Sequence, residues 1–208
     1  MSLNKKMVMD VLREVYDPEY PISIIEMNIV DEDSIEILDR GRIRVTFKPT
    51  TPFCPMGGLI GVLVKYALEK KAIDASVIVC EGAGTIVTNN PQLVQGVGAR
   101  MTGVFYTSPI SEIIRRIEDV GGYVVFRETA RIDQIEGVRK AIELGYKKIA
   151  VTVNGYLGEN LSELRRLGEN NSVSIISLVV CTTGIEKERA EEIAEYADLA
   201  WSCASLHT

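Results

Sequence analysis

The stretch Thr50-Thr51-Pro52-Phe53-Cys54-Pro55-Met56-Gly57-Gly58 joins a predicted strand to a predicted apolar helix over residues 59–69. Proline is favoured at the first position of a helix, so Pro55 in that place would make Cys54 the N-cap residue. The positive end of the helix dipole there favours the thiolate form of a cysteine, which is the form that binds metals and attacks electrophiles. The alternative is a half-buried cysteine that only packs in a turn.

The composition is that of one large or two small globular domains, because the chain has 208 residues, 46% of them hydrophobic and 25% charged. The sequence shows no secretory signal and no apolar run near the length of a membrane span, which predicts a cytoplasmic protein without membrane contact. A net charge of −6 without a basic cluster argues against nucleic acid as a partner. The four cysteines then favour thiol or metal chemistry over a disulfide framework.

The first part of the chain has the pattern of a small α+β unit, which we expect over residues 1–72. Apolar residues recur at helical spacing over residues 5–15. Residues 34–38 and 42–48 flank the turn signal Asp39-Arg40-Gly41 and are typical of a β-hairpin. The apolar helix after Cys54 completes the order α-β-β-α.

Two motifs in this unit carry a family resemblance, and they read Asp17-Pro18-Glu19-Tyr20-Pro21-Ile22-Ser23-Ile24-Ile25-Glu26-Met27-Asn28-Ile29-Val30 and Thr50-Thr51-Pro52-Phe53-Cys54-Pro55-Met56. Over residues 5–70 the chain resembles the iron–sulfur (metal–sulfur) cluster assembly family. The resemblance implies a reactive surface site built from Asp17, Glu19, Thr50, Thr51 and Cys54. It also implies assembly proteins of the iron–sulfur pathway as partners.

From Ile73 onward, short β-branched runs alternate with helical patterns, which predicts an α/β three-layer Rossmann-like domain over residues 73–208 with a mainly parallel sheet. Ser108-Pro109 is expected to begin one of the helices, with Ser108 as its N-cap. The expected strands cover residues 76–80, 123–126, 148–153, 173–180 and 199–203, and other expected helices cover residues 132–144, 161–167 and 186–196.

The segment Glu81-Gly82-Ala83-Gly84-Thr85 follows the first of these strands. It lacks the third glycine of the dinucleotide fingerprint, and residues 85–88 are β-prone where a helix should open. The segment therefore favours a tight hairpin or a loop that tolerates phosphate, and we expect no nucleotide cofactor.

Reactive and polar groups cluster at the predicted carboxyl ends of the strands, where ligands bind in sheets of this kind. Three thiols that gather there would bind zinc, or an iron–sulfur cluster with a fourth ligand, whereas the alternative is cysteine as a small apolar residue at the end of a buried strand. The three candidate metal ligands are Cys80, Cys181 and Cys203. The candidate ligand-binding residues are Gly82, Gly84, Thr85, Arg127, Asn154, Thr182 and Thr183.

A second resemblance covers about residues 58–207. It rests on several collinear segments, among them Val77-Ile78-Val79-Cys80-Glu81-Gly82-Ala83-Gly84-Thr85, Thr129-Ala130-Arg131-Ile132-Asp133-Gln134 and Ser202-Cys203-Ala204-Ser205. This part is similar to the archaeal methanogenesis marker protein 8 family, which has no assigned reaction. The resemblance implies an archaeal, anaerobic setting and methanogenesis-related partners.

Three functions follow from these patterns. The first is an accessory protein for metal–sulfur cofactor assembly, in which exposed thiols handle an iron–sulfur cluster or a metal ion. The second is a Rossmann-like enzyme or sensor that binds a small molecule, with Cys181 or Cys203 as nucleophile. The one histidine, His207, is expected to be idle, which weakens activation by a Cys–His pair. The third is an interaction module whose cysteines only pack. An exposed apolar sheet edge would favour a homodimer.

Overall fold

The computed structural model describes residues 3–16, 23–27, 29–38, 41–46, 56–98 and 106–201, with only the backbone described for residues 56–58 and 98. The chain divides into two compact units, Met1–Pro55 and Met56–Thr208. The helix that follows Cys54 in the sequence therefore belongs to the second unit, although we expected the boundary near residue 72. Among the described helices, none is both long and apolar enough to cross a membrane.

The described residues of the first unit form one α-helix and an antiparallel strand pair. Helix α1 (Lys5–Leu12) begins at Asn4, whose side-chain oxygen accepts a hydrogen bond from the Met7 N–H and so satisfies an unpaired donor of the first turn. A short 3-10 helix (Glu32–Ser34) leads into β1 (Ile35–Ile37), which pairs with β2 (Ile43–Val45). The predicted hairpin is thus confirmed, in shorter form.

The described residues of the second unit form a six-stranded sheet with the order β5-β4-β3-β6-β7-β8. Pairs β3–β6, β6–β7 and β7–β8 are parallel, whereas β4 is antiparallel to both β3 and β5. All strands except β4 consequently point the same way, which confirms the α/β class and the mainly parallel sheet. The strands are β3 (Ala75–Cys80), β4 (Gly84–Thr88), β5 (Tyr123–Val124), β6 (Lys148–Asn154), β7 (Ser174–Val180) and β8 (Leu199–Ala200).

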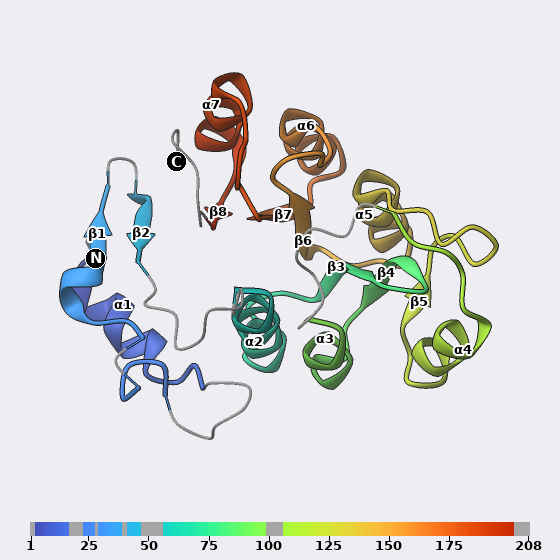
Figure 1. Ribbon diagram of the computed structural model, residues 1–208, viewed down its shortest axis with the longest axis horizontal. Helices are drawn as coiled ribbons and strands as arrows, with labels where there is room; N and C mark the ends of the chain where they lie inside the picture. Colours follow the sequence, from blue (N-terminus) through green and yellow to red (C-terminus); the bar gives the residue numbers. More distant parts are fainter. Residues whose placement is uncertain are drawn as a thin grey trace. The chain divides into compact units, whose positions relative to one another are not determined.

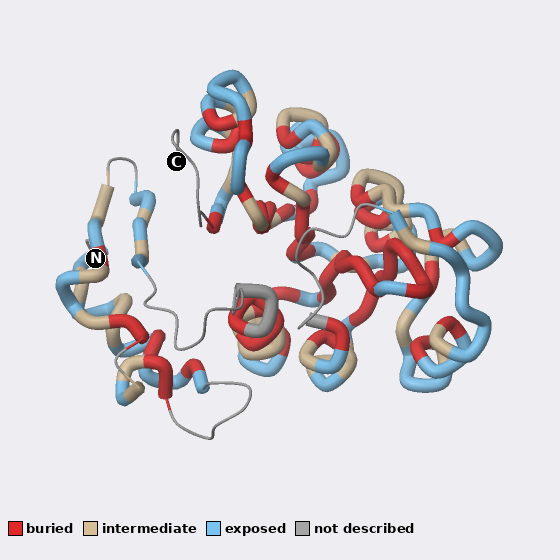
Figure 2. The backbone as a smooth tube through the Cα atoms, viewed as in Figure 1, coloured by how far each residue is buried: buried red, intermediate tan, exposed pale blue. Residues whose placement is uncertain are grey.

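Helices cover both faces of this sheet. Figure 1 shows α5, α6 and α7 on one face and α2, α3 and α4 on the other. Buried residues follow the strands and the inner faces of the helices, as Figure 2 shows, because apolar side chains on both faces of the sheet are removed from water. The helices are α2 (Met56–Glu69), α3 (Pro91–Gly98), α4 (Ser111–Asp119), α5 (Gln134–Glu143), α6 (Leu161–Asn171) and α7 (Lys187–Tyr196).

The predicted start of α4 at Ser108-Pro109 is wrong. The helix begins at Ser111, and Ile110 occupies the N-cap position without a side-chain capping bond. The reason is a tertiary contact, because the Gly82 N–H donates to Thr107 Oγ1 at 2.8 Å and the Ile110 N–H donates to the Gly82 carbonyl at 2.8 Å. These bonds hold residues 107–110 against the end of β3 and delay the helix.

The turn between β3 and β4 confirms the predicted tight hairpin. Cys80 pairs with Gly84, and the Ala83 N–H donates to the Cys80 carbonyl at 3.1 Å. Gly82 takes φ +86°, a conformation that a residue with a Cβ adopts only at a cost. Because a strand follows Gly84 where a dinucleotide fingerprint requires a helix, this loop differs from the Rossmann phosphate loop.

The central strands β3 and β6 are pinned at both ends. At the start of β6, the Asp74 carboxylate accepts the N–H groups of Lys147 and Lys148 at 3.0 and 2.9 Å. The two strands pair as far as Val77 and Val151, although both continue for three more residues. Beyond that point a side chain from α5 joins them, as described below.

Candidate functional site

The carboxyl ends of β3, β5, β6, β7 and β8 lie at one edge of the sheet, because these strands share one direction. We call this the carboxyl edge. The loops that follow β3, β5, β6 and β7 cover residues 81–83, 125–133, 155–160 and 181–186. Most of the residues predicted to bind a ligand or metal in the second unit lie at this edge.

Gln134, the first residue of α5, fills the place where β3 and β6 stop pairing. Its side-chain N–H group donates to the Thr152 carbonyl at 2.7 Å and to the Val77 carbonyl at 3.3 Å. Its side-chain oxygen accepts the Thr85 hydroxyl at 2.8 Å. The amide is buried and its hydrogen-bonding capacity is used, so it joins β3, β4 and β6 to the helix that lies across them.

A carboxylate lies beside this network. Glu159 Oε1 accepts the Gln134 N–H at 2.7 Å and thereby caps α5, together with the N-cap residue Asp133. Burial raises the pKa of Glu159 above its ordinary value, while the bond from Gln134 and the charge of Arg189 lower it by less. A carboxyl group with a raised pKa at the carboxyl edge can exchange a proton closer to neutral pH than an exposed one.

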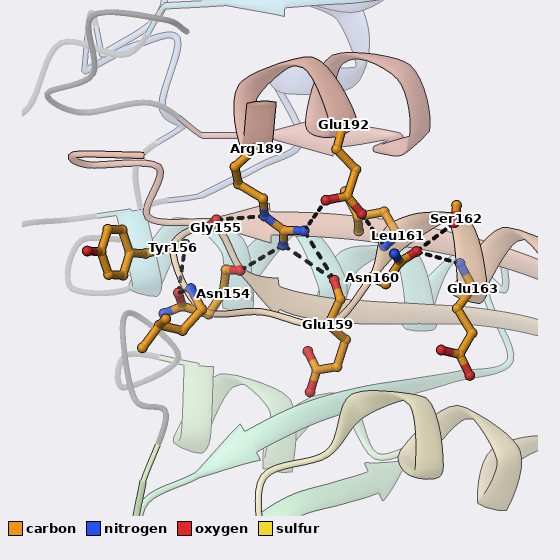
Figure 3. Close-up of polar contacts among 11 residues, drawn as sticks. Asn154, Gly155, Tyr156, Glu159, Asn160, Leu161, Ser162, Glu163, Arg189 and Glu192 are labelled. Atoms are coloured by element: carbon orange, nitrogen blue, oxygen red, sulfur yellow. Dashed lines mark hydrogen bonds and ion pairs between the residues drawn. The ribbon is translucent and has the colours of Figure 1, made fainter. Parts of the chain in front are cut away.

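Arg189 of α7 fixes the loop after β6, as Figure 3 shows. Its guanidinium group donates to the carbonyls of Gly155 at 2.9 Å and Asn154 at 3.3 Å, and to that of Glu159 at 3.4 Å. Its charge is balanced by Glu192 at 2.6 Å, and the second oxygen of Glu192 accepts the Leu161 N–H at 2.9 Å. One ion pair on α7 therefore holds both the loop and the start of α6.

The glycine loop predicted to bind a ligand is engaged by the protein itself. The Gly82 N–H is bonded to Thr107, and the Thr85 N–H donates to the Arg131 carbonyl at 3.1 Å. A Cβ at Gly84 would lie 2.2 Å from the Ala130 carbonyl oxygen. Only glycine fits at this position, because the backbone of residues 130–131 lies so close to it. A ligand at this loop would have to replace these contacts.

The other predicted ligand residues occupy different settings. Arg127 is exposed and paired with Glu118 at 3.2 Å. Asn154 is half-buried and its side chain holds its own loop, whereas Thr182 is buried with its hydroxyl on the Trp201 carbonyl at 3.1 Å. Thr183 is exposed. Ligand binding by this set stays a prediction.

Two of the three predicted metal ligands, Cys80 and Cys181, lie at the ends of different strands. Cys80 is buried at the end of β3, and Cys181 is half-buried directly after β7, with β6 between the two strands. Cys181 takes φ +62°, which is unusual for a residue other than glycine. Within the described residues, no group of three or more His, Cys, Asp or Glu side chains is placed to hold a metal. Cys203 lies outside those residues, so the three-thiol site stays a prediction.

The predicted site of the first unit lies outside the described residues as well. This applies to all five of its members, Asp17, Glu19, Thr50, Thr51 and Cys54.

Sequence reasoning missed Gln134, Glu159, Arg189 and Glu192. Gln134 follows a typical N-cap aspartate, and a polar residue there looks like an exposed member of a first turn. Arg189 and Glu192 lie in the charged run of α7, where a buried ion pair has the same pattern as a solvated one. The one available signal was the pair Gly155 and Gly158, whose close backbone contacts mark a constrained loop.

The structure thus defines a unit with a helix and an antiparallel strand pair, followed by an α/β unit whose candidate site lies at the carboxyl edge of its sheet. Residues 58–208 match the profile of a family described as "uncharacterized protein conserved in archaea", and the chain belongs to this family. Residues 5–78 match the profile of the family described as "iron-sulfur cluster assembly protein".

Individual relatives divide in the same way. An uncharacterized protein of Methanocaldococcus jannaschii is 52% identical over 141 residues, which are 67% of this chain and 48% of the relative. Cytosolic iron-sulfur assembly component 2B of Mus musculus is 35% identical over 68 residues, 32% of this chain and 42% of the relative. MIP18 family protein galla-2 of Drosophila melanogaster is 36% identical over 66 residues, 31% of this chain and 42% of the relative. The chain thus spans about half the length of the curated relatives it matches.

Proposed function

We propose that this protein is an accessory factor in iron–sulfur (metal–sulfur) cofactor assembly or maturation, working through cysteine thiols in an archaeal, anaerobic setting. The observation that carries the proposal is the match of residues 5–78 to the iron–sulfur cluster assembly family, supported by relatives named as cytosolic iron-sulfur assembly components. The motif with Cys54 lies inside that match.

The iron or cluster is cargo in this proposal. An iron–sulfur cluster takes four thiolate ligands as a rule, and Cys80 is buried within the sheet. Cys181 is half-buried at the carboxyl edge, where its thiol is closer to solvent. In this proposal Cys54 handles iron in the first unit, and the strand-end thiols Cys80, Cys181 and Cys203 form a separate site in the second unit. Ligands from a partner would complete either site, which suits a factor that passes a cluster on. Iron–sulfur assembly proteins and methanogenesis-related proteins are the partners we propose.

The test is anaerobic reconstitution with ferrous iron and sulfide, followed by measurement of bound iron, bound sulfide and the charge-transfer absorption of iron–thiolate bonds. We expect Cys54→Ser to lose most of the bound iron and Cys181→Ser to lose part of it. Glu169→Gln, at an exposed position of α6 without a thiol, is the control. Full iron loading of the Cys54→Ser and Cys181→Ser variants would overturn the proposal.

The second candidate is a Rossmann-like enzyme or sensor that binds a small molecule at the carboxyl edge. It is favoured by the early end of β3–β6 pairing, which places Gln134, Glu159 and Asp133 at the point where the chain connections change direction in the sheet. A thermal-shift screen of small metabolites separates the two functions. A stabilising compound whose effect survives all four cysteine substitutions would favour this second candidate.

A further inference from the structure

Glu159 joins the loop after β6 to the first turn of α5. This loop covers residues 155–160 and leads from β6 to α6. Glu159 Oε1 accepts the N–H of Gln134, the first residue of α5, at 2.7 Å. The bond connects two segments of the carboxyl edge that are 25 residues apart in the sequence.

Further hydrogen bonds attach the same loop to α7 and β7. Arg189 of α7 donates to the carbonyls of Gly155 at 2.9 Å and Glu159 at 3.4 Å, and the Gly155 N–H donates to the Val180 carbonyl at 2.7 Å. These bonds join backbone groups to one another or to a guanidinium group that stays charged, so they do not depend on the protonation of a carboxyl group. The bond to α5 differs from them, because its acceptor is a titratable side chain.

The Glu159 carboxyl group lies near several charges. Figure 3 shows it pointing away from the Arg189 guanidinium group, which bonds the backbone carbonyl of Glu159. Three guanidinium groups of the neighbouring elements form ion pairs with other carboxylates at 2.6–3.2 Å. These ion pairs are Arg189 with Glu192, Arg131 with Asp133, and Arg139 with Glu136 and Glu163.

Two effects oppose ionisation of Glu159. Burial, the larger one, removes the carboxylate from water, and Asp133, the N-cap residue directly before Gln134, carries a like charge. The N–H groups of Gln134 and of Glu159 itself and the charge of Arg189 favour the carboxylate by less. The pKa of Glu159 is consequently raised above its ordinary value.

A proton on Glu159 therefore stabilises the closed arrangement, in which the loop is bonded to α5. When the loop leaves the helix, water surrounds the carboxyl group and its pKa returns to the ordinary value. Because the closed arrangement binds the proton more tightly than the open one, a rise in pH through the raised pKa shifts the population toward the open arrangement. The ratio of the two acid dissociation constants sets the size of this shift.

We propose that Glu159 is a pH-sensitive latch between the loop 155–160 and α5. With its proton bound, the side chain holds the loop on the first turn of the helix. Loss of the proton releases this contact while Arg189 keeps the loop on α7, so the loop and the start of α5 separate at the carboxyl edge. The latch needs neither a thiol nor iron, and the inference therefore goes beyond the proposed function.

Hydrogen exchange tests the latch, with the amide of Gln134 as the reporter because it is bonded to Glu159. A protection factor compares each amide with an unstructured peptide at the same pH, so the pH dependence of the exchange chemistry cancels. Between about pH 4 and about pH 7 we expect the protection factor of this amide to fall at least about threefold in the wild-type chain. The amides of β6, in the middle of the sheet, report global unfolding and should fall by less.

Three variants assign the change to the latch. Glu159→Gln keeps an oxygen acceptor for the Gln134 N–H and does not titrate, so protection should stay constant with pH. Asp133→Asn keeps an N-cap side chain and removes the neighbouring charge, so the fall in protection should move to lower pH. Glu169→Gln, at an exposed position of α6, should behave as the wild type.

Two results would overturn the proposal. Protection of the Gln134 amide that stays constant or rises with pH would mean that the carboxylate holds the helix at least as firmly as the carboxylic acid does. A fall that persists in Glu159→Gln, or that equals the fall at the β6 amides, would mean that another group titrates or that the whole unit loosens. Circular dichroism confirms that each variant is folded, and the wild-type chain with Asp133→Asn decides the outcome if Glu159→Gln does not fold.

Discussion

The side-chain amide of Gln134 donates to the backbone carbonyl of Thr152 at 2.7 Å, and this bond bridges α5 and β6 where the ladder between β3 and β6 has ended. Two strands that stop pairing leave carbonyl groups without ladder partners, and a buried carbonyl needs a donor. Gln134 provides that donor from a helix, so the edge at which ligands bind in this class of sheet is shaped by one side chain.

Substitution of this glutamine should be costly. Gln134→Leu fills a similar volume but removes the donors to Thr152 and Val77 and the acceptor for Thr85. We expect a loss of about 2–4 kcal/mol in the free energy of unfolding, measured with urea, because buried polar groups are left unpaired. Gln92→Leu, at an exposed position of α3, should change the same quantity by less than about 0.5 kcal/mol. Equal effects of the two substitutions would contradict the bridging role.

The ion pair between Arg189 and Glu192 should contribute more to the free energy of unfolding than the exposed ion pairs of the same unit. Its side chains are only 15% and 24% exposed, compared with 74% and 58% for Arg116 and Glu112. Arg189→Ala should cost about 2–3 kcal/mol and Arg116→Ala about 0.5 kcal/mol or less in urea unfolding.

Hydrogen exchange gives a second measure of the same pair. Arg189→Ala should release the amides of Tyr156 and Leu157 to faster exchange, because the carbonyls around the loop tip lose their donor. Unchanged exchange at these two amides in a folded Arg189→Ala variant would mean that Asn154 alone holds the loop.

Glu159 predicts a pH dependence of stability. A carboxyl group whose pKa is raised on folding contributes stability that is fully present below its unfolded pKa and is lost as the pH rises through the folded pKa. Glu159→Gln keeps an oxygen acceptor for the Gln134 N–H and removes the titration. The variant should therefore become more stable relative to the wild type as the pH rises from below 4.5 toward neutral. Urea unfolding across this range measures the difference, with Glu169→Gln as an exposed control; a constant difference would count against burial as the cause.

The left-handed backbone conformation of Cys181 allows a substitution that tests whether its thiol has a chemical role. Glycine at φ +62° relieves strain but adds entropy to the unfolded chain, so Cys181→Gly should stay within about 1 kcal/mol of the wild type. If the thiol works on iron, this folded variant should bind less iron after reconstitution. Ser172→Gly is the matched control, since Ser172 has φ +52° and no thiol, and it should retain full iron loading.

The regular parts of the second unit could be predicted from the sequence because their local patterns agree with the fold. Strand β6 was expected over 148–153 and runs Lys148–Asn154, and α5 begins after Asp133, whose side chain accepts the Glu136 N–H. Buried β-branched runs and capping residues are local signals, so they can be recognised in the sequence without knowing which elements pack together.

The rest depended on contacts between distant residues. Ser108 has the sequence of an N-cap, but the bonds between Gly82 and residues 107–110 override that local preference. The left-handed conformation of Cys181 has no sequence signal, because cysteine is not a typical turn residue. The burial of Glu159 and Arg189 also arises only when α7 is laid against the loop after β6.

The hydrogen bonds of Asp74 and Gln134, at the two ends of the β3–β6 pair, indicate where the chain of the second unit could be cut. Asp74 and Val77 lie before the exposed segment Arg127-Glu128-Thr129, whereas their partners Lys147, Lys148 and Gln134 lie after it. Cleavage within this segment would leave these hydrogen bonds and the β3–β6 pairing between the two fragments intact. The two fragments should therefore reassociate when expressed separately, which makes the unit a candidate for a split reporter of encounters between proteins.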